Sequence, residues 1–341
     1  MELLALDKNF APIRYLTYIN LQWDRAYYTC GTFSVQIPAA AYSADIAYIY
    51  TKDRDETGIA QKVSYETTIK GAFVQISGFF LEQILKDKII YPTYYAHGNL
   101  ETAVRAMVTQ YKADIPLLTL GAAHNLGSSV TWQETGGEMD IVCATALQTQ
   151  ELSYRCRYSL QENKIYFEIW KGIDRTQDQS INNFATFSHG FGNLQEARAD
   201  TDNSNFKNFA LVAGSGEGAA RITQEVDLSG GGYRKKLFVD AKSIAYDPDK
   251  QTLAAYKESL TQKGLEKLLE YQNIFNVDVE VSTAQFIYRT DFDLGDKIDI
   301  IIDDIGIAMT ARIIAIHEVV KDGTHTVCVE VGDKIIQKVR T

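Results

Sequence analysis

The sequence predicts an α+β protein that is mainly β, and three observations support this class. Segments with the two-residue alternation of half-buried strands occupy both ends of the chain. Segments with helical spacing of apolar residues are confined to the middle and to one later stretch. Near the C-terminus, three β-like runs are joined by glycine-containing turns. In the last of these runs, Val327, Val329 and Val331 alternate with Cys328 and Glu330.

Residues 1–96 are predicted to form a first β domain. Apolar and β-branched residues recur in six runs bounded by turn residues, which is typical of strands. Gly78 then precedes a short predicted helix, Phe79–Lys86, in which Leu81, Ile84 and Leu85 share one face. The predicted strands are Leu3–Leu6, Ile13–Ile19, Gly31–Ile37, Ala44–Thr51, Lys62–Ile69 and Ala72–Ser77.

Residues 97–196 are predicted to form a small α+β domain. Asn99 is a suitable N-cap for a helix whose apolar residues recur with helical spacing from Leu100 to Tyr111. The segment Thr135–Glu138 matches a capping box, which predicts that a second helix starts there. A strand pair follows, with predicted bounds Ser153–Leu160 and Lys164–Lys171.

A second β domain is predicted from residues 197–240 and 282–341, divided by a helical insertion over 241–281. The strand sets on either side are too short for separate sheets, so we expect the strands of 208–240 to pair with those of 297–331. Within the insertion, Asp249–Phe275 has an apolar stripe at helical spacing, and Gly264 is expected to divide it into two helices. The predicted strands are Asn208–Ala213, Arg221–Val226, Lys236–Asp240, Lys297–Asp303, Met309–Val320 and His325–Val331.

The composition is that of an ordinary globular protein with two or three domains: 341 residues, 45% hydrophobic and 23% charged. No apolar run approaches the ~20 residues that span a bilayer, and no signal peptide is recognised, so Met1 is expected to be the native start. The formal charge is −10 and Arg234–Lys236 is the only tight basic cluster, which disfavours specific nucleic-acid binding. The wide spacing of the four cysteines favours buried reduced thiols, although the sequence leaves open whether Cys143 and Cys156 form a disulfide.

No motif predicts a catalytic, cofactor-binding or metal-binding residue. The glycine-rich segment Gly214–Gly218 follows a strand but lacks the lysine of a phosphate loop, so we predict a hairpin connection. The five histidines lack zinc-site spacing, and no serine lies in a nucleophile elbow.

Two acidic segments are weaker candidates for a divalent ion. Asp200, Asp202 and Ser204 have the spacing of a calcium loop, but the later glycine and glutamate of that loop are missing. A second cluster surrounds Gly295, and an acidic turn is favoured there over an ion site because oxygen-ligand spacing is so permissive. This second cluster consists of Asp291, Asp293 and Asp296.

Four stretches resemble the phage tail hub family, the siphovirus tail or baseplate-hub-like proteins of phages and prophages of Gram-positive bacteria. Their order and spacing cover nearly the whole chain, although Lys88 stands where the family more often has arginine. The stretches are Trp23–Tyr27 with Gly31–Pro38; Val74–Leu85; Gly172–Thr176 with Phe187–Asn193 and Asn205–Arg221; and Asp293–Ile298.

The resemblance implies a structural tail hub without enzymatic activity or cofactor. Two β-barrel-like tube domains per chain, here 1–96 and 197–240 with 282–341, would assemble as a homotrimer. The resulting ring would join the sixfold tail tube to the tail tip or baseplate and surround the DNA channel. Implied partners are a tail tube or distal tail protein above and a tip, spike or tape-measure protein at the channel.

The same resemblance implies a location in the virion tail, or in a tail-like particle, after assembly in the cytoplasm of the bacterial host. DNA would pass through the ring without specific binding, which the net negative charge suits. No membrane insertion by this chain is expected.

Two alternative functions stay open. A tail-associated cell-wall hydrolase could use two of the 44 acidic residues, because glycosidase carboxylates follow no spacing rule. A carbohydrate-binding adhesin would need exposed aromatic platforms, whereas Trp23, Trp132 and Trp170 lie in strand-like or turn-flanked segments that favour core positions.

Overall fold

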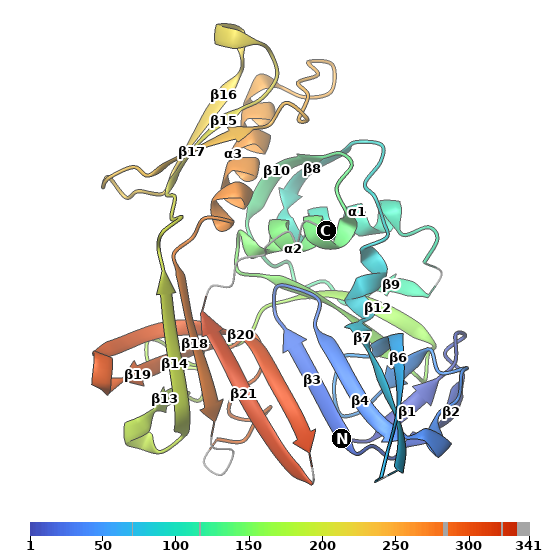
Figure 1. The fold of residues 1–341 in the computed structure, drawn as a ribbon. Coiled ribbons are helices and arrows are strands. Elements are labelled where there is room, and N and C mark those ends of the chain that lie inside the picture. The colour runs from blue at the N-terminus through green and yellow to red at the C-terminus, as the bar shows by residue number, and fades with distance from the viewer. Residues whose placement is uncertain (70, 116, 282–285, 322, 333–341) are drawn as a thin grey trace.

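The computed structural model describes residues 1–69, 71–115, 117–281, 286–321 and 323–332, and it has three parts stacked along its length (Figure 1). A large sheet forms one end, an α+β part with two helices lies in the middle, and a small sheet with the longest helix forms the other end. The class predicted from the sequence, mainly β with α+β parts, is confirmed.

The N-terminal β half consists of the first seven strands. In β3 and β4 every second residue is buried, which gives both strands one core face and one outer face. The short helix predicted at Phe79–Lys86 is a 3₁₀ turn, Leu81–Leu85, because β7 continues as strand to Phe80. The strands are β1 (Leu3–Leu6), β2 (Pro12–Leu16), β3 (Asn20–Ala26), β4 (Thr32–Pro38), β5 (Tyr48–Tyr50), β6 (Gly58–Thr68) and β7 (Gly71–Phe80), with a 3₁₀ turn at Ala39–Ala41.

The C-terminal β half includes the closing meander, whose three predicted strands are confirmed. It also contains β18, so residues 274–281 are a strand where the sequence predicted helix; β18 pairs with both β14 and β21. The strands are β13 (Thr186–Ser188), β14 (Leu194–Asp202), β18 (Ile274–Val281), β19 (Lys297–Ile302), β20 (Ile307–Lys321) and β21 (Thr324–Gly332), with 3₁₀ turns at His189–Phe191 and Asp303–Ile305.

One continuous sheet joins the two halves, because β3 pairs antiparallel with β20 along its whole length. The strand order is β14-β18-β21-β20-β3-β4-β7-β6-β5-β1-β2, with β19 and β13 branching from β20. This order is open at both ends, and no pairing among the described residues closes it into a barrel. We call the paired segment the β3–β20 junction.

The middle part packs two helices on small sheets. Asn99 caps α1 as predicted, since its side chain accepts a hydrogen bond from the Thr102 N–H at 3.2 Å. The prediction of a capping box at Thr135–Glu138 is wrong. The chain turns at Gly136, where φ is +78°, and the N-cap residue of α2 is Glu138, whose side chain forms no capping hydrogen bond. The elements are β8 (Tyr94–Asn99), α1 (Leu100–Tyr111), β9 (Leu118–Leu120), β10 (Ser129–Glu134), α2 (Met139–Gln148), β11 (Ser153–Ser159) and β12 (Lys164–Trp170).

The remaining part is a three-stranded sheet covered by α3 (Leu253–Leu269), as Figure 1 shows. Its strands β15 (Phe209–Ala213), β16 (Thr223–Asp227) and β17 (Lys236–Asp240) pair with one another in the described structure. The expected pairing with strands of 297–331 is therefore wrong. The physical reason is that three strands packed against a helix have a sufficient core of their own.

That core also explains why α3 is one helix. A Cβ added at Gly264 would lie 2.6 Å from Val226 Cγ2 and 2.9 Å from Val212 Cγ2, so the missing side chain lets the helix approach the sheet. The predicted break at Gly264 is wrong, and the helix ends before the predicted Phe275 because β18 begins at Ile274. No helix among the described residues is long and apolar enough to span a membrane. The domain boundaries given above stay a prediction.

Candidate functional site

The core face of the β3–β20 junction contains a buried ionic network centred on Arg25. Arg25 is 3% exposed, and its guanidinium donates to Glu56 Oε1 at 2.7 Å, to Asp293 Oδ1 at 2.6 Å and to the Tyr288 hydroxyl at 2.8 Å. Glu56 belongs to the N-terminal half, whereas Asp293 and Tyr288 precede β19. A single side chain thus connects the two halves.

Glu318 is the acidic centre of the same network and lies opposite Trp23 in the strand pair. Its carboxylate accepts from Arg54 Nε at 2.6 Å and from a second Arg54 nitrogen, from the Tyr288 hydroxyl at 3.1 Å and from His325 Nε2 at 3.3 Å. Burial alone would raise the pKa of Glu318, but the hydrogen bonds from Arg54 and His325 lower this pKa to about 2. The carboxylate is therefore charged over the physiological range.

On the opposite face of the junction, His317 lies between two carboxylates. Its Nδ1 is 2.8 Å from Asp24 Oδ1 on β3, and its Nε2 is 2.9 Å from Glu330 Oε1 on β21. Hydrogen bonds to Asp24 and Glu330 raise the pKa of His317 to about 9, so the imidazole is protonated at neutral pH. Three adjacent strands are connected by this one cation.

His317 belongs to a polar face that extends from β14 to β6. The strand registers place the outward residues of eight successive strands on this side, and none of these charged side chains is fully buried. Acidic groups outnumber basic ones here, so the face has a negative potential. The acids are Asp24, Glu66, Asp200, Asp202, Asp278 and Glu330, and the bases are Lys62, Arg198, His317 and Lys321.

At the two ends of the polar face, β14 and β6 each have a backbone edge without a partner in the described structure. β14 pairs only with β18. β6 pairs with β5 at Gly58 and Ile59, and the Ala60 N–H donates to the Ala47 carbonyl at 2.9 Å, so the outer edge of β6 is free beyond Ala60 in the described structure. Along this free stretch Val63 is 46% and Tyr65 is 65% exposed, although both lie opposite buried β7 residues on the core face. Exposed apolar edges of this kind are templates for pairing with another chain.

The glycine-rich segment Gly214–Gly218 joins β15 to β16, as predicted for a hairpin connection. The Tyr256 hydroxyl of α3 accepts from the Ser215 N–H at 2.7 Å and donates to the Ile244 carbonyl at 2.7 Å. A Cβ at Gly214 would lie 2.1 Å from that hydroxyl oxygen, and Gly216 has φ +101°. The glycines thus permit the loop to pack closely on the helix.

The carboxylates of the two acidic segments pair with arginine side chains and a backbone N–H of the same chain. Asp200 pairs with Arg198 at 2.8 Å, and Asp202 accepts from the Ser204 N–H. In the second segment, Asp293 pairs with Arg25 and Asp296 pairs with Arg175 at 2.7 Å. In the described part of the chain, no group of three or more metal-ligating side chains has the geometry to hold an ion.

The cysteines and tryptophans have structural positions. All four cysteines are free thiols, so the Cys143–Cys156 disulfide left open above is not formed, and burial raises the pKa of both of these thiols. Trp23 is fully buried and Trp132 is 3% exposed, which confirms their predicted core positions. Neither side chain forms an exposed aromatic platform.

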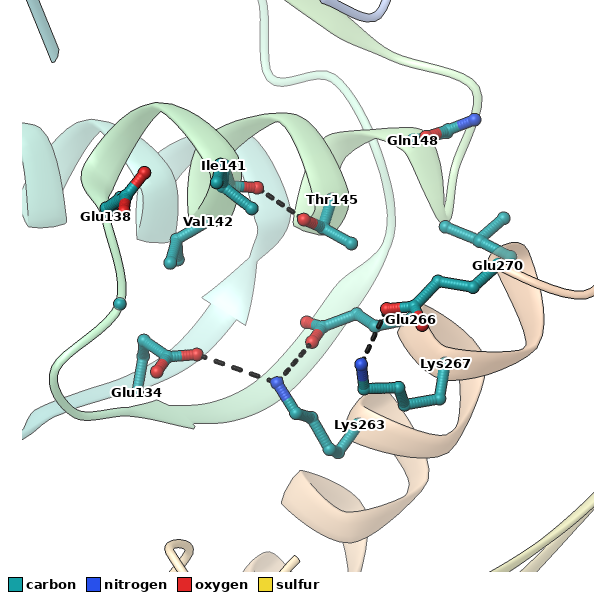
Figure 2. A pocket seen from close by; sticks show the side chains of 12 residues that line it. Glu134, Glu138, Ile141, Val142, Thr145, Gln148, Lys263, Glu266, Lys267 and Glu270 are labelled. Atoms are coloured by element: carbon teal, nitrogen blue, oxygen red, sulfur yellow. Dashed lines mark hydrogen bonds and ion pairs between the residues drawn. The ribbon is translucent and has the colours of Figure 1, made fainter. Parts of the chain in front are cut away.

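A pocket of about 140 Å³ lies between α2, β10 and α3, and Figure 2 shows the side chains that line it. Lys263 lies 3.3 Å from Glu266 and 3.9 Å from Glu134, and Lys267 donates to Glu270 at 2.6 Å. Glu266, followed by Glu134, raises the pKa of Lys263 although burial opposes this. The Lys263–Glu134 pair connects the middle part to α3, whereas the other two pairs lie within α3 and its C-cap, and we assign no chemistry to the pocket.

Sequence reasoning missed the residues of the β3–β20 junction. It considered the histidines only for zinc-site spacing, which they lack, and it did not predict β3 as a strand. A usable signal was present: Arg25 and Glu318 occupy positions that alternate with outward residues in apolar strands, where a charge must be paired.

Comparison with known proteins adds a family and a fold. The family model for Siphovirus ReqiPepy6 Gp37-like proteins matches residues 6–333. No curated protein matches the chain.

Three solved structures share the fold over nearly the whole chain. The tail protein from Neisseria meningitidis MC58 has 14% identity and a TM-score of 0.60, covering 97% of this chain and 96% of that chain. The prophage tail protein gp18 from Listeria monocytogenes EGD-e has 13% identity and a TM-score of 0.58, covering 99% and 96%. The 43 kDa tail protein of prophage MuSo2 from Shewanella oneidensis has 11% identity and a TM-score of 0.59, covering 97% of each chain. At such identities the likeness shows a common fold.

Proposed function

The chain belongs to the Siphovirus ReqiPepy6 Gp37-like protein family, and on this premise we propose that it is a structural tail hub. In this proposal three copies form a closed ring that joins the tail tube to the tail tip or baseplate. The DNA channel runs through the ring. The fold shared with three tail proteins, two of them from prophages, supports a structural tail role.

The observation that carries the proposal is the continuous sheet with free edges at β14 and at the outer stretch of β6. Eight strands lie between these two edges. When β6 of one copy pairs with β14 of the next, the interface is head-to-tail, which generates a ring if the rotation closes. Val63 and Tyr65 would then be covered by the neighbouring copy.

The polar face is the surface we assign to the channel. Its excess of carboxylates repels the phosphates of DNA, so the chain would let DNA slide without specific contacts. The opposite face of the same strands is occupied by the apolar cores, which leaves the polar face as the side available to solvent in the channel.

Electron microscopy of the purified protein, together with mass photometry, tests the ring. We expect a trimer with a central channel. A matched pair of variants tests the edge: Tyr65→Lys should abolish the trimer, whereas Tyr233→Lys should leave it intact, because Tyr233 is 84% exposed in the loop before β17. A dimer without a channel, or equal assembly of both variants, contradicts the proposal.

We further propose that no residue of this chain is catalytic. The acidic residues of the motifs considered above are engaged by arginines and backbone N–H groups, which supports a structural role. Cell-wall zymography should show no clearing by the purified chain. A clearing zone that survives repurification would instead favour the hydrolase alternative.

A further inference from the structure

A cavity of about 20 Å³ lies where the two β halves and the middle part of the chain meet. Its lining comes from β3, from the loop before β6, from the end of β7, from β11 and β12, and from the segment before β19. A volume of about 10–15 Å³ is enough to hold one water molecule when two or more polar partners surround it.

Three buried polar atoms of residues that line this cavity have no hydrogen-bond partner among the described residues. They are Glu56 Oε2, Glu82 Oε2 and Trp170 Nε1. The other carboxylate oxygens are fixed: Glu56 Oε1 accepts from Arg25 Nε at 2.7 Å, and Glu82 Oε1 accepts from the Cys156 N–H at 2.8 Å. The set therefore contains two acceptors and one donor.

Buried polar atoms that are left without a hydrogen bond destabilise the folded protein. One water molecule has the right hydrogen-bonding capacity for all three, because it can accept from an indole N–H and donate to two carboxylate oxygens. A metal cation fits less well, since Arg25 and Arg155 line the same cavity and the indole N–H requires an acceptor.

We propose that this cavity binds one water molecule bridging Glu56, Glu82 and Trp170, and that Glu82 holds a proton that it donates to this water. When the proton is bound, Glu82 donates to the water and the water donates to Glu56. When the proton leaves, two negative charges face one buried cavity at the meeting point of three parts of the chain.

The surroundings of Glu82 support proton binding near neutral pH. Burial, with a further contribution from Glu56, raises the pKa of Glu82 to about 7, although the Cys156 N–H and Arg155 oppose this. Glu82 is 8% exposed. The other titratable groups around it are the thiols of Cys30 and Cys156 and the phenol of Tyr154, which lines the same cavity. Burial raises the pKa of all three well above its usual range, so they stay neutral over this pH window.

The indole of Trp170 provides the readout. In protein labelled with ¹⁵N-tryptophan, the Trp170 N–H resonance, assigned by its loss in Trp170→Phe, should shift with one midpoint near pH 7. Glu82→Gln should abolish this titration, whereas the matched control Glu217→Gln, on an exposed loop, should keep it. A pH-independent resonance between pH 5 and 9, or the same midpoint in Glu82→Gln, overturns the proton on Glu82.

A second variant keeps the test decisive if Glu82→Gln does not fold. Glu56→Gln removes the neighbouring negative charge and should lower the midpoint, so an unchanged midpoint overturns the pairing of the two carboxylates. A crystal structure at better than about 2 Å resolution tests the water directly. We expect one density peak within hydrogen-bond distance of all three groups, and a cavity without density overturns the water site.

Discussion

Replacing His317 by glutamine tests whether one imidazolium stabilises the β3–β20 junction. The pKa of His317 is raised in the folded protein from 6.5 to about 9, so the folded state retains a proton that the unfolded chain loses. The stabilisation is complete below pH 6.5 and is lost as the pH rises through 9. At ~1.4 kcal/mol per pH unit, a rise of about 2.5 units corresponds to at most about 3.5 kcal/mol.

Solvent reduces this value, because the imidazole is 32% exposed, and we expect about 2 kcal/mol. The assay is urea unfolding at fixed protein concentration, in steps from pH 7.5 to 9.5. This range lies above the pKa of about 7 for Glu82, so the titration of that group contributes little. The free energy of unfolding of the native protein should fall across the range, and that of His317→Gln should stay constant.

The matched control is His124→Gln, since His124 is exposed and forms none of the ion pairs of the described residues. It should keep the pH dependence of the native protein. If native protein and His317→Gln lose stability in parallel between pH 7.5 and 9.5, the assignment of the charge to His317 is refuted.

Three further outcomes are expected from the same stability measurements. Glu318→Gln should lower the free energy of unfolding by about 3–5 kcal/mol at pH 7, because Arg54 loses a buried partner. The native protein should lose this contribution as the pH falls from 4.5 to about 2, and an equally steep acid transition in the variant would contradict the assignment. Gly216→Val should destabilise the sheet of β15, β16 and β17, because φ at Gly216 is +101° and a Cβ there would lie 2.8 Å from the Ala220 carbonyl oxygen. The control Glu217→Gln should leave the melting temperature unchanged. Equal melting temperatures of the two variants would refute this expectation. Gly264→Ala should lower the melting temperature despite the ~1 kcal/mol gain in helix propensity, because its Cβ meets Val226, and a higher melting temperature would show that the sheet adjusts.

Local patterns predicted the elements whose signals lie within a few residues. The cap at Asn99 and the alternation of Val327 to Val331 involve neighbouring positions, and both are confirmed. The break at Gly264 was wrong because the side chains that fill the space beside it come from Val212 and Val226, some forty to fifty positions earlier. Tertiary packing there overrides the helix propensity of glycine.

The site was harder to predict for the same reason. Arg25, Glu56 and Asp293 come from three distant segments, and no spacing in the sequence connects them. Pairing between strands of 208–240 and 297–331 was expected from strand length alone, but the contacts of α3 decide that these strands stay separate. The small cavity by Glu82 depends on atoms from six segments and has no sequence signature.

The pairing of β3 with β20 also has a consequence for biosynthesis. Asp24 and His317 are 293 positions apart, so at 5–20 residues per second β3 waits about 15–60 s for its partner strand. During this interval one backbone edge of the N-terminal half is open to other nascent chains. An inward-pointing charge is one of the devices that discourage such pairing, and Arg25 is such a charge on β3. The arginine that later connects the two halves thus also protects the emerging chain until its own C-terminal strands arrive.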